Sequence, residues 1–209
     1  MPRSSDPLLV LEPPAGAGCL LFDWDGTLAD STAANAAAFS AAVQPYGGEV
    51  SPDWFVRHAG LSAVEAVRVA ALEQGLEVDE IRFCADRDRH YLARLGEVRE
   101  VRPVADLARA QHGRRRLAVV SGGGRTTLLA GLRHLGLDHL FDVVVAREDA
   151  AHGKPAPDLY REALRRLGVP ADRAVAYEDT DEGLQAAAGA GVAAIDVRPV
   201  RSTRRPMSS

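Results

Sequence analysis

Short apolar runs alternate with longer amphipathic stretches along most of the chain. The first apolar run, 19–22, lies far upstream of the others and ends directly at a pair of aspartates. Strands that alternate with helices predict a parallel sheet covered by helices on both faces. Four further runs typical of strands follow from residue 100 onward, separated by stretches with helical spacing of Leu, Val and Ala: 116–120, 141–145, 173–177 and 192–196.

This order of elements predicts an α/β fold, a Rossmann-like three-layer arrangement around one parallel sheet of five core strands. Right-handed crossovers let the first strand take a central place in such a sheet. With the strands numbered along the chain, we expect the order 3-2-1-4-5. The α/β core would then comprise residues 18–32 and 100–198.

The stretch 33–99 predicts helices and no strand. The sequence over 30–43 is rich in alanine, the best helix former. Ser51 before Pro52 is typical of a helix start, and helical stretches follow up to residue 95. We therefore expect an all-helical cap inserted into the core over 33–99.

The two ends of the chain show little periodicity. Residues 1–17 contain four prolines, which predicts a loosely ordered leader. Residues 199–209 are polar and rich in arginine, which predicts a flexible, solvated tail.

The composition limits the kinds of molecule that this protein is expected to bind. Apolar residues make up 46% of the 209 residues, enough for a sizeable core. The formal net charge of −4 favours neither nucleic-acid binding nor membrane binding. Two cysteines and the lack of a long apolar run indicate a soluble protein in a reducing, cytoplasmic setting. We expect a monomer, because no extra apolar surface is evident.

Polar side chains follow three of the expected strands. Asp23 and Asp25 follow the first, Ser121 the second, and Glu178 with Asp179 the fourth. The carboxyl ends of parallel strands meet at one edge of a sheet, so these groups can converge there. Carboxylates without histidines suit Mg²⁺, which shares its coordination shell with phosphate oxygens.

Each of these signals taken alone has a simpler explanation. Ser121 with three glycines is compatible with a tight turn, and Lys154, in the loop after the third strand, with a solvated lysine. A dinucleotide-binding loop is excluded, because the third glycine position of that motif is occupied by Thr127. The joint occurrence of these groups at strand ends is what favours a phosphate-handling site.

The sequence resembles the haloacid dehalogenase-like hydrolase superfamily. The resemblance covers nearly the whole chain after the leader. The C-terminal half of the chain is similar to the fructose-1-phosphate phosphatase and β-phosphoglucomutase branch of this superfamily. Four motifs carry it: Asp23-Trp24-Asp25-Gly26-Thr27-Leu28, Ser121, Lys154 before Pro155, and Glu178-Asp179.

The resemblance implies a role for each acidic residue. Asp23 would be the nucleophile that forms an aspartyl-phosphate. Asp25 would be the general acid and then the general base. Mg²⁺ would be held by the Asp23 carboxylate, the backbone carbonyl of Asp25, and Asp179, with Glu178 binding directly or through water.

The resemblance also implies a set of phosphate contacts. Ser121 and the Gly122 amide would hold the phosphoryl group, and Thr27 of the first motif would belong to the same set. Lys154 would offset charge on the nucleophile and the phosphoryl oxygens, which is the kind of stabilisation that phosphoryl transfer needs.

The function implied is a Mg²⁺-dependent phosphatase acting on a small phosphorylated metabolite such as fructose 1-phosphate. A β-phosphoglucomutase-type mutase is disfavoured, because Ala63 and Asn35 occupy places where the mutase pattern has arginine and histidine. A phosphoglycolate phosphatase and a non-catalytic phosphometabolite-binding protein are the remaining alternatives.

Overall fold

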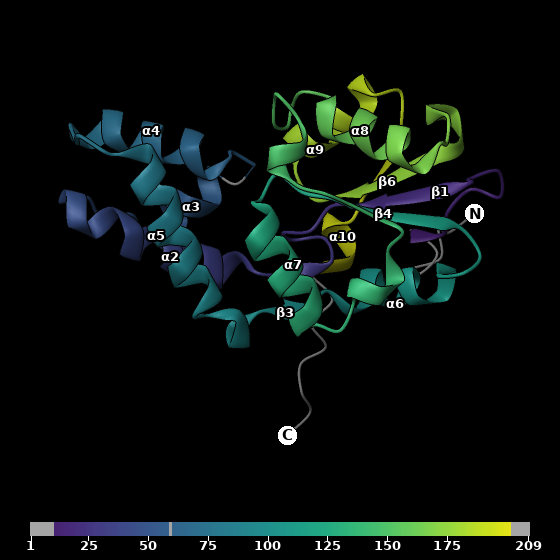
Figure 1. Ribbon diagram of the computed structural model, residues 1–209, viewed down its shortest axis with the longest axis horizontal. Coiled ribbons are helices and arrows are strands. Elements are labelled where there is room, and N and C mark those ends of the chain that lie inside the picture. The colour runs from purple at the N-terminus through teal and green to yellow at the C-terminus, as the bar shows by residue number, and fades with distance from the viewer. Residues whose placement is uncertain (1–10, 59, 202–209) are drawn as a thin grey trace.

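A five-stranded parallel sheet forms the centre of the molecule (Figure 1). The computed structural model describes residues 11–58 and 60–201, and within them the sheet has the order β5-β4-β1-β6-β7. In chain order of the core strands this is 3-2-1-4-5, so the predicted fold class and strand order are confirmed. The strands are β1 Cys19–Phe22, β4 Arg116–Val120, β5 Val143–Val145, β6 Ala174–Glu178 and β7 Ala193–Asp196.

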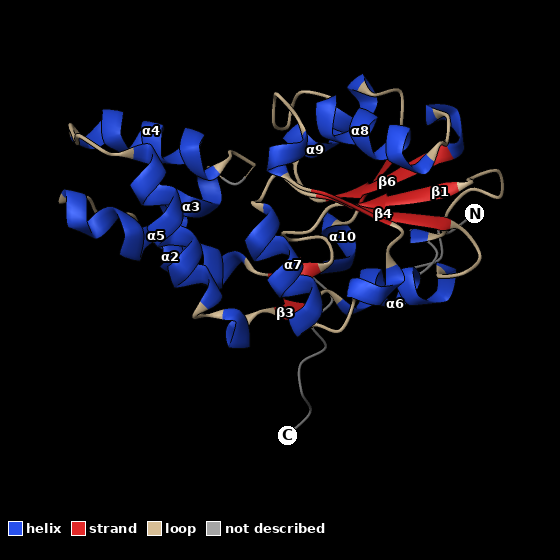
Figure 2. Cartoon of the chain, in the orientation of Figure 1, coloured by secondary structure: helices blue, strands red, loops and turns tan. Residues whose placement is uncertain are grey.

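Helices cover both faces of this sheet (Figure 2). Because side chains alternate along a strand, Leu20 and Phe22 of β1 pack on one face, while Cys19 and Leu21 pack on the other. The first face is covered by α6 (Arg102–Gln111), α7 (Arg125–His134) and α10 (Arg198–Arg201), and the second by α8 (Asp158–Leu167) and α9 (Asp181–Gly189). Short 3-10 turns lie at Gln44–Tyr46, Leu95–Glu97, Asp138–Leu140, Arg147–Asp149 and Ala171–Arg173.

The described parts of both ends are packed more tightly than expected. Leu11, within the predicted leader 1–17, is buried, and its carbonyl accepts a hydrogen bond from the Tyr177 hydroxyl at 2.9 Å. Val200, within the predicted tail 199–209, is buried in the same apolar cluster. The expectation of loose order is wrong for these parts, because an apolar side chain in each reaches the core. The rest of both segments lies outside the described residues.

Four helices form a separate bundle beside the sheet (Figure 1). This bundle has an aromatic core of its own, in which the ring of Phe39 lies 5.8 Å from that of Trp54 and 4.9 Å from that of Phe83, measured between centroids. An all-helical insertion is thus present, and 33–99 stays its proposed extent. The helices are α2 (Thr32–Val43), α3 (Pro52–Arg57), α4 (Ala63–Gln74) and α5 (Glu80–Leu92).

A short antiparallel pair joins the two connections between cap and core. β2 (Ala29–Asp30) pairs with β3 (Arg99–Glu100), so the chain enters and leaves the cap side by side. The expectation of no strand over 33–99 is therefore wrong at Arg99. Two residues are too few to produce a periodic signal, and the pairing depends on the return of the chain from the cap.

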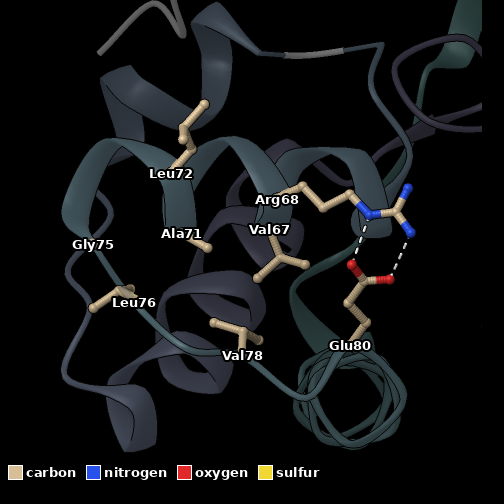
Figure 3. A pocket seen from close by; sticks show the side chains of 8 residues that line it. All are labelled: Val67, Arg68, Ala71, Leu72, Gly75, Leu76, Val78 and Glu80. Atoms are coloured by element: carbon tan, nitrogen blue, oxygen red, sulfur yellow. Dashed lines mark hydrogen bonds and ion pairs between the residues drawn. The ribbon is translucent and has the colours of Figure 1, made fainter.

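A surface hollow of about 440 Å³ opens in the cap beside α4 (Figure 3). Its walls include Val67 and Ala71, and the ion pair of Arg68 with Glu80 lies at one side. Leu72, which the helical pattern groups with apolar positions, is 86% exposed at this hollow. The hollow is built from cap residues alone and contributes none of the predicted site residues.

Both cysteines are free thiols, buried in the case of Cys19 and half-buried in the case of Cys84. Burial raises the pKa of the Cys19 thiol to about 11, so this thiol stays protonated at neutral pH. Among the described residues, no helix combines the length and the apolar character needed to cross a membrane.

Candidate active site

The loop after β1 carries Asp23 and Asp25 and folds tightly back on itself. Gly26 has a φ of 84°, a left-handed conformation that glycine adopts at little cost. Its N–H donates to the Ala29 carbonyl at 2.7 Å, and the Ala29 N–H donates to the Trp24 carbonyl at 2.9 Å. These bonds hold the two aspartates in one compact turn at the carboxyl end of the central strand.

Lys154 connects two of the predicted carboxylates inside the protein. Its Nζ donates to Asp23 Oδ1 at 2.6 Å and to Glu178 Oε1 at 2.5 Å. A third bond, at 3.0 Å, goes to the backbone carbonyl of Val120 at the end of β4. The Lys154 side chain is only 7% exposed, which rules out a solvated lysine. Three segments distant in sequence therefore meet at one ammonium group.

The charged groups around Lys154 shift the pKa values of Asp23 and of Lys154 itself. Burial raises the pKa of Asp23 well above its usual range, Lys154 opposes that rise, and the negative charges of Glu178 and Asp179 add to it. Burial alone would lower the pKa of Lys154, but the carboxylates of Asp23 and Glu178 outweigh it and the pKa is raised. Lys154 therefore stays a cation at neutral pH.

Two residues that the sequence analysis does not single out confine the Glu178 carboxylate. The Tyr160 hydroxyl, from α8, donates to Oε1 at 2.5 Å. A Cβ at Gly183, in α9, would come within 2.1 Å of the Glu178 carboxyl carbon, so a larger residue at this position would displace the carboxylate. Burial, followed by the negative charge of Glu178, raises the pKa of Tyr160, which keeps the phenol protonated and able to donate.

Asp179 completes an acidic cluster at the edge of the sheet. Asp23, Glu178 and Asp179 each offer one carboxylate oxygen, and these three atoms lie within 4.8 Å of one another. Three carboxylates against the one ammonium of Lys154 leave a net negative charge that a further cation would offset, and oxygen donors without histidine or cysteine fit Mg²⁺. The Thr27 hydroxyl donates to Asp179 Oδ1 at 3.3 Å, so it supports the cluster, and its contact with phosphate stays a prediction. The Asp25 backbone carbonyl as a metal ligand also stays a prediction.

Ser31, just before the cap, and Asn35, inside it, hold the carboxylate of Asp25. Its Oδ1 accepts hydrogen bonds from Ser31 Oγ at 2.5 Å and from Asn35 Nδ2 at 2.8 Å. Ser31 occupies the N-cap position of α2 but makes no capping bond with its side chain, which serves Asp25 instead. Asn35 Oδ1 accepts from Arg87 Nη2 of α5 at 2.5 Å. Two cap helices thus act on one carboxylate of the core.

The glycine loop after β4 faces this carboxylate. Ser121 is buried, and its hydroxyl accepts a hydrogen bond from the Gly123 N–H at 2.9 Å. A Cβ at Gly123 would lie 3.7 Å from Asp25 Oδ2, whereas a Cβ at Gly122 would meet no atom within 4 Å. The space beside Gly122 on that side is therefore open, and a phosphate contact of the Gly122 amide stays a prediction.

Trp24, between the two aspartates, is buried against α7. A Cβ at Gly131 of that helix would lie 2.5 Å from Trp24 Cζ2. The indole fills the space left by the absence of a side chain at Gly131. This contact fixes the middle of the loop that carries Asp23 and Asp25.

One family model spans this whole arrangement. The model for haloacid dehalogenase-like hydrolases matches residues 20–197, from the central strand through the cap to the last strand. The chain belongs to the haloacid dehalogenase-like hydrolases. The match includes the acidic loop, Ser121, Lys154 and the Glu178-Asp179 pair, and confirms the resemblance on which the sequence analysis relied.

Curated relatives of this hydrolase include phosphatases. The fructose-1-phosphate phosphatase YqaB of Escherichia coli is 36% identical over 188 residues, which cover 86% of this chain and 95% of YqaB. A phosphorylated carbohydrates phosphatase of Thermotoga maritima is 30% identical, covering 83% of this chain and 81% of the relative. These names confirm the prediction of a phosphoric monoester hydrolase.

Solved structures share the fold of this hydrolase. CbbY from Rhodobacter sphaeroides, in complex with phosphate, has a TM-score of 0.78 at 29% identity, covering 85% of this chain and 84% of that one. A β-phosphoglucomutase from Clostridium difficile has a TM-score of 0.76 at 17% identity, covering 85% and 83%, and this likeness concerns the fold alone.

Proposed function

We propose that this hydrolase is a Mg²⁺-dependent phosphatase that cleaves a small sugar phosphate, such as fructose 1-phosphate, through an aspartyl-phosphate intermediate. One observation carries the proposal: the buried Asp23 carboxylate is bound to Lys154 beside two further carboxylates, while Asp25 faces the Ser121 loop. The similarity to the fructose-1-phosphate phosphatase of Escherichia coli supports the choice of substrate.

The first step forms a bond between an Asp23 carboxylate oxygen and phosphorus and breaks the bond from phosphorus to the sugar oxygen. Lys154, held at Asp23, and Ser121, with the Gly122 amide, would stabilise charge on the phosphoryl oxygens. Mg²⁺, held by the carboxylates of Asp23 and Asp179 with Glu178, would neutralise charge on the nucleophile and the phosphoryl group when bound.

Asp25 moves the proton in both steps. Its Oδ1 accepts hydrogen bonds from Ser31 and Asn35, so the proton that it donates belongs on Oδ2, which faces the Gly123 side of the loop. The departing sugar oxygen takes this proton. In the second step Asp25 removes a proton from water, which attacks phosphorus and releases Asp23 and inorganic phosphate.

A sugar bisphosphate is the second candidate substrate. CbbY from Cereibacter sphaeroides is 36% identical over 197 residues, and a solved CbbY structure contains xylulose 1,5-bisphosphate. Ala63 at the start of α4 and Asn35 in α2 still disfavour a mutase, because neither supplies the charge expected for a second phosphate in the cap. Monomeric state and cytoplasmic location stay predictions.

A phosphate-release panel tests the proposal. Fructose 1-phosphate, xylulose 1,5-bisphosphate, phosphoglycolate and p-nitrophenyl phosphate are each incubated with the protein, with Mg²⁺ or with EDTA. We expect Mg²⁺-dependent release that is fastest with a sugar phosphate and abolished by Asp23→Asn. No release from any of these phosphoesters would contradict an enzyme and favour a binding protein, and release by Asp23→Asn at the unaltered rate would contradict the covalent step.

A further inference from the structure

The three N–H groups of Lys154 are all engaged in this structure. They bind Asp23, Glu178 and the Val120 carbonyl at 2.6, 2.5 and 3.0 Å. An ammonium group has three donors and no acceptor, so a contact with a phosphoryl oxygen requires Lys154 to give up one of these bonds. Release of the neutral Val120 carbonyl leaves no charge unpaired, so the question concerns the two carboxylates: which of them can release the lysine and still keep a donor.

Glu178 is the partner that keeps a second donor. Its Oε1 accepts from both Lys154 and Tyr160, each at 2.5 Å, and the residue is fully buried. If Lys154 turns toward substrate, the Tyr160 hydroxyl continues to satisfy the same oxygen. The other donor to this carboxylate is the Asp179 N–H, 3.3 Å from Oε2, so the Tyr160 bond lowers the cost of moving Lys154 away from Oε1.

The Glu178 carboxylate also has a fixed place. Tyr160 holds it from α8, and Gly183 of α9 leaves room for it on the other side, because a Cβ at Gly183 would lie 2.1–2.3 Å from its carboxyl atoms. Oε2 lies against Gly183 and accepts a hydrogen bond from the Asp179 N–H at 3.3 Å. The helices on this face of the sheet therefore fix the position of the Glu178 carboxylate.

We propose that Tyr160 is a positioning residue: its hydroxyl anchors Glu178 Oε1, so that the Glu178 carboxylate keeps its place beside Asp23 and Asp179 when Mg²⁺ binds and Lys154 is released to the phosphoryl group. This inference rests on the proposed function and extends it to a residue in the apolar face of α8. In the proposed reaction, Tyr160 contacts neither the substrate nor the reacting atoms.

Tyr160→Phe tests this inference with Tyr177→Phe as a matched control. Both tyrosines are buried in the core and each hydroxyl donates one hydrogen bond, but that of Tyr177 goes to the Leu11 carbonyl on the opposite face of the sheet. Isothermal titration calorimetry with MgCl₂ on the full chain measures metal affinity. A second titration, with inorganic phosphate at saturating Mg²⁺, measures phosphate affinity.

We expect Tyr160→Phe to raise the Kd for Mg²⁺ by about tenfold, the lower end of what loss of a residue behind a metal ligand costs. Its phosphate affinity should also fall, because Glu178 then retains Lys154. Tyr177→Phe should match the unaltered chain in both titrations. A Tyr160→Phe protein with unchanged affinities would overturn the inference while leaving the phosphatase proposal intact.

Gly183→Ala provides a second test of this inference if the Tyr160→Phe protein does not fold. Alanine suits a helix better than glycine, while its Cβ would displace the Glu178 carboxylate from Tyr160. Weaker Mg²⁺ binding is expected, and unchanged Mg²⁺ binding would overturn the inference. Absence of Mg²⁺ binding by the unaltered chain would overturn both this inference and the metal dependence of the proposed function.

Discussion

Asp23 and Asp25 stand two residues apart, yet different parts of the molecule hold them. Asp23 is bound by Lys154, which also binds Glu178, so the core sets its position. Asp25 is bound by Ser31, just before the cap, and by Asn35 inside it. The comparison indicates that the proposed nucleophile is held by the core, whereas the proposed proton donor depends on the placement of the cap.

The two environments also differ in charge. Around Asp23, one buried ammonium lies among three carboxylates, so removing a charge there leaves others uncompensated. Around Asp25, the direct partners are a hydroxyl and an amide, and the charge of Arg87 acts one residue further away. Substitutions on the Asp23 side should therefore affect stability and turnover together, whereas those on the Asp25 side should affect proton transfer selectively.

The largest effect is expected from Lys154→Met. This change leaves the carboxylates of Asp23 and Glu178 buried without their cation, which should cost about 3–5 kcal/mol in the free energy of unfolding. Phosphate release should fall to background. Urea unfolding followed by circular dichroism and a phosphate-release assay measure the two effects. Arg165→Met, which removes an exposed pair with Glu162, is the control, and equal stability of the two variants would contradict the fixed core cluster.

Asn35→Leu should act on proton transfer. The loss of a hydrogen bond to the Asp25 carboxylate corresponds to about 1.5–3 kcal/mol, or roughly 10–100-fold in turnover of a sugar phosphate. The effect on p-nitrophenyl phosphate should be much smaller, because its leaving group needs little protonation. The ratio of kcat for the two substrates is the measurement, with Ser40→Ala on the same helix as control. An equal loss on both substrates would contradict a role in proton transfer.

Arg87→Met should show the same selectivity with a smaller effect. Arg87 donates to Asn35 Oδ1 and so directs the Asn35 NH₂ group toward Asp25. Its loss permits the amide to turn, which should lower kcat on a sugar phosphate by roughly fivefold, equivalent to about 1 kcal/mol. Arg89→Met, on the exposed side of the same helix, should leave kcat unchanged. If Arg89→Met had the same effect, a general role of charge on α5 would replace the proposed link from cap to Asp25.

Gly131→Ala should lower stability, by less than Lys154→Met. Its Cβ would collide with the Trp24 ring, and overpacking of a core of this kind costs about 1–3 kcal/mol. Trp24→Leu opens the space, so the double variant should lose less than the sum of the two single losses. Thermal and urea unfolding of the four proteins give the coupling free energy. Additive losses would show that Trp24 and Gly131 do not share this space.

Several features of the site could be predicted from the sequence, because the groups concerned are polar and lie at the ends of apolar strands. Asp23, Ser121 and Glu178 are of this kind, and parallel strands bring their carboxyl ends together. Tyr160 could not be predicted in the same way, since an aromatic residue on the apolar face of a helix is typical of core packing. Arg87 is one of several arginines along α5, and only its contact with Asn35 distinguishes it.

The hydrogen-bond partner of Asn35 is identified by the structure and not by the sequence. It is a polar residue within an alanine-rich helix and is almost fully buried, which indicates a specific partner. In the sequence it is a departure from the mutase pattern, and its partner is not evident. Asp25 lies ten positions earlier and becomes that partner because the loop after β1 turns back toward α2.

The amino-acid sequence by itself determined the order of strands and helices, the family and the set of polar groups at the strand ends, because these depend on local patterning and spacing. The tertiary structure decided which partner each group has: Lys154 between two carboxylates, Tyr160 and Gly183 around Glu178, and Ser31 and Asn35 on Asp25. The physical reason is that hydrogen bonds and charge interactions act over a few ångströms, and only packing brings side chains that are distant in sequence within that range.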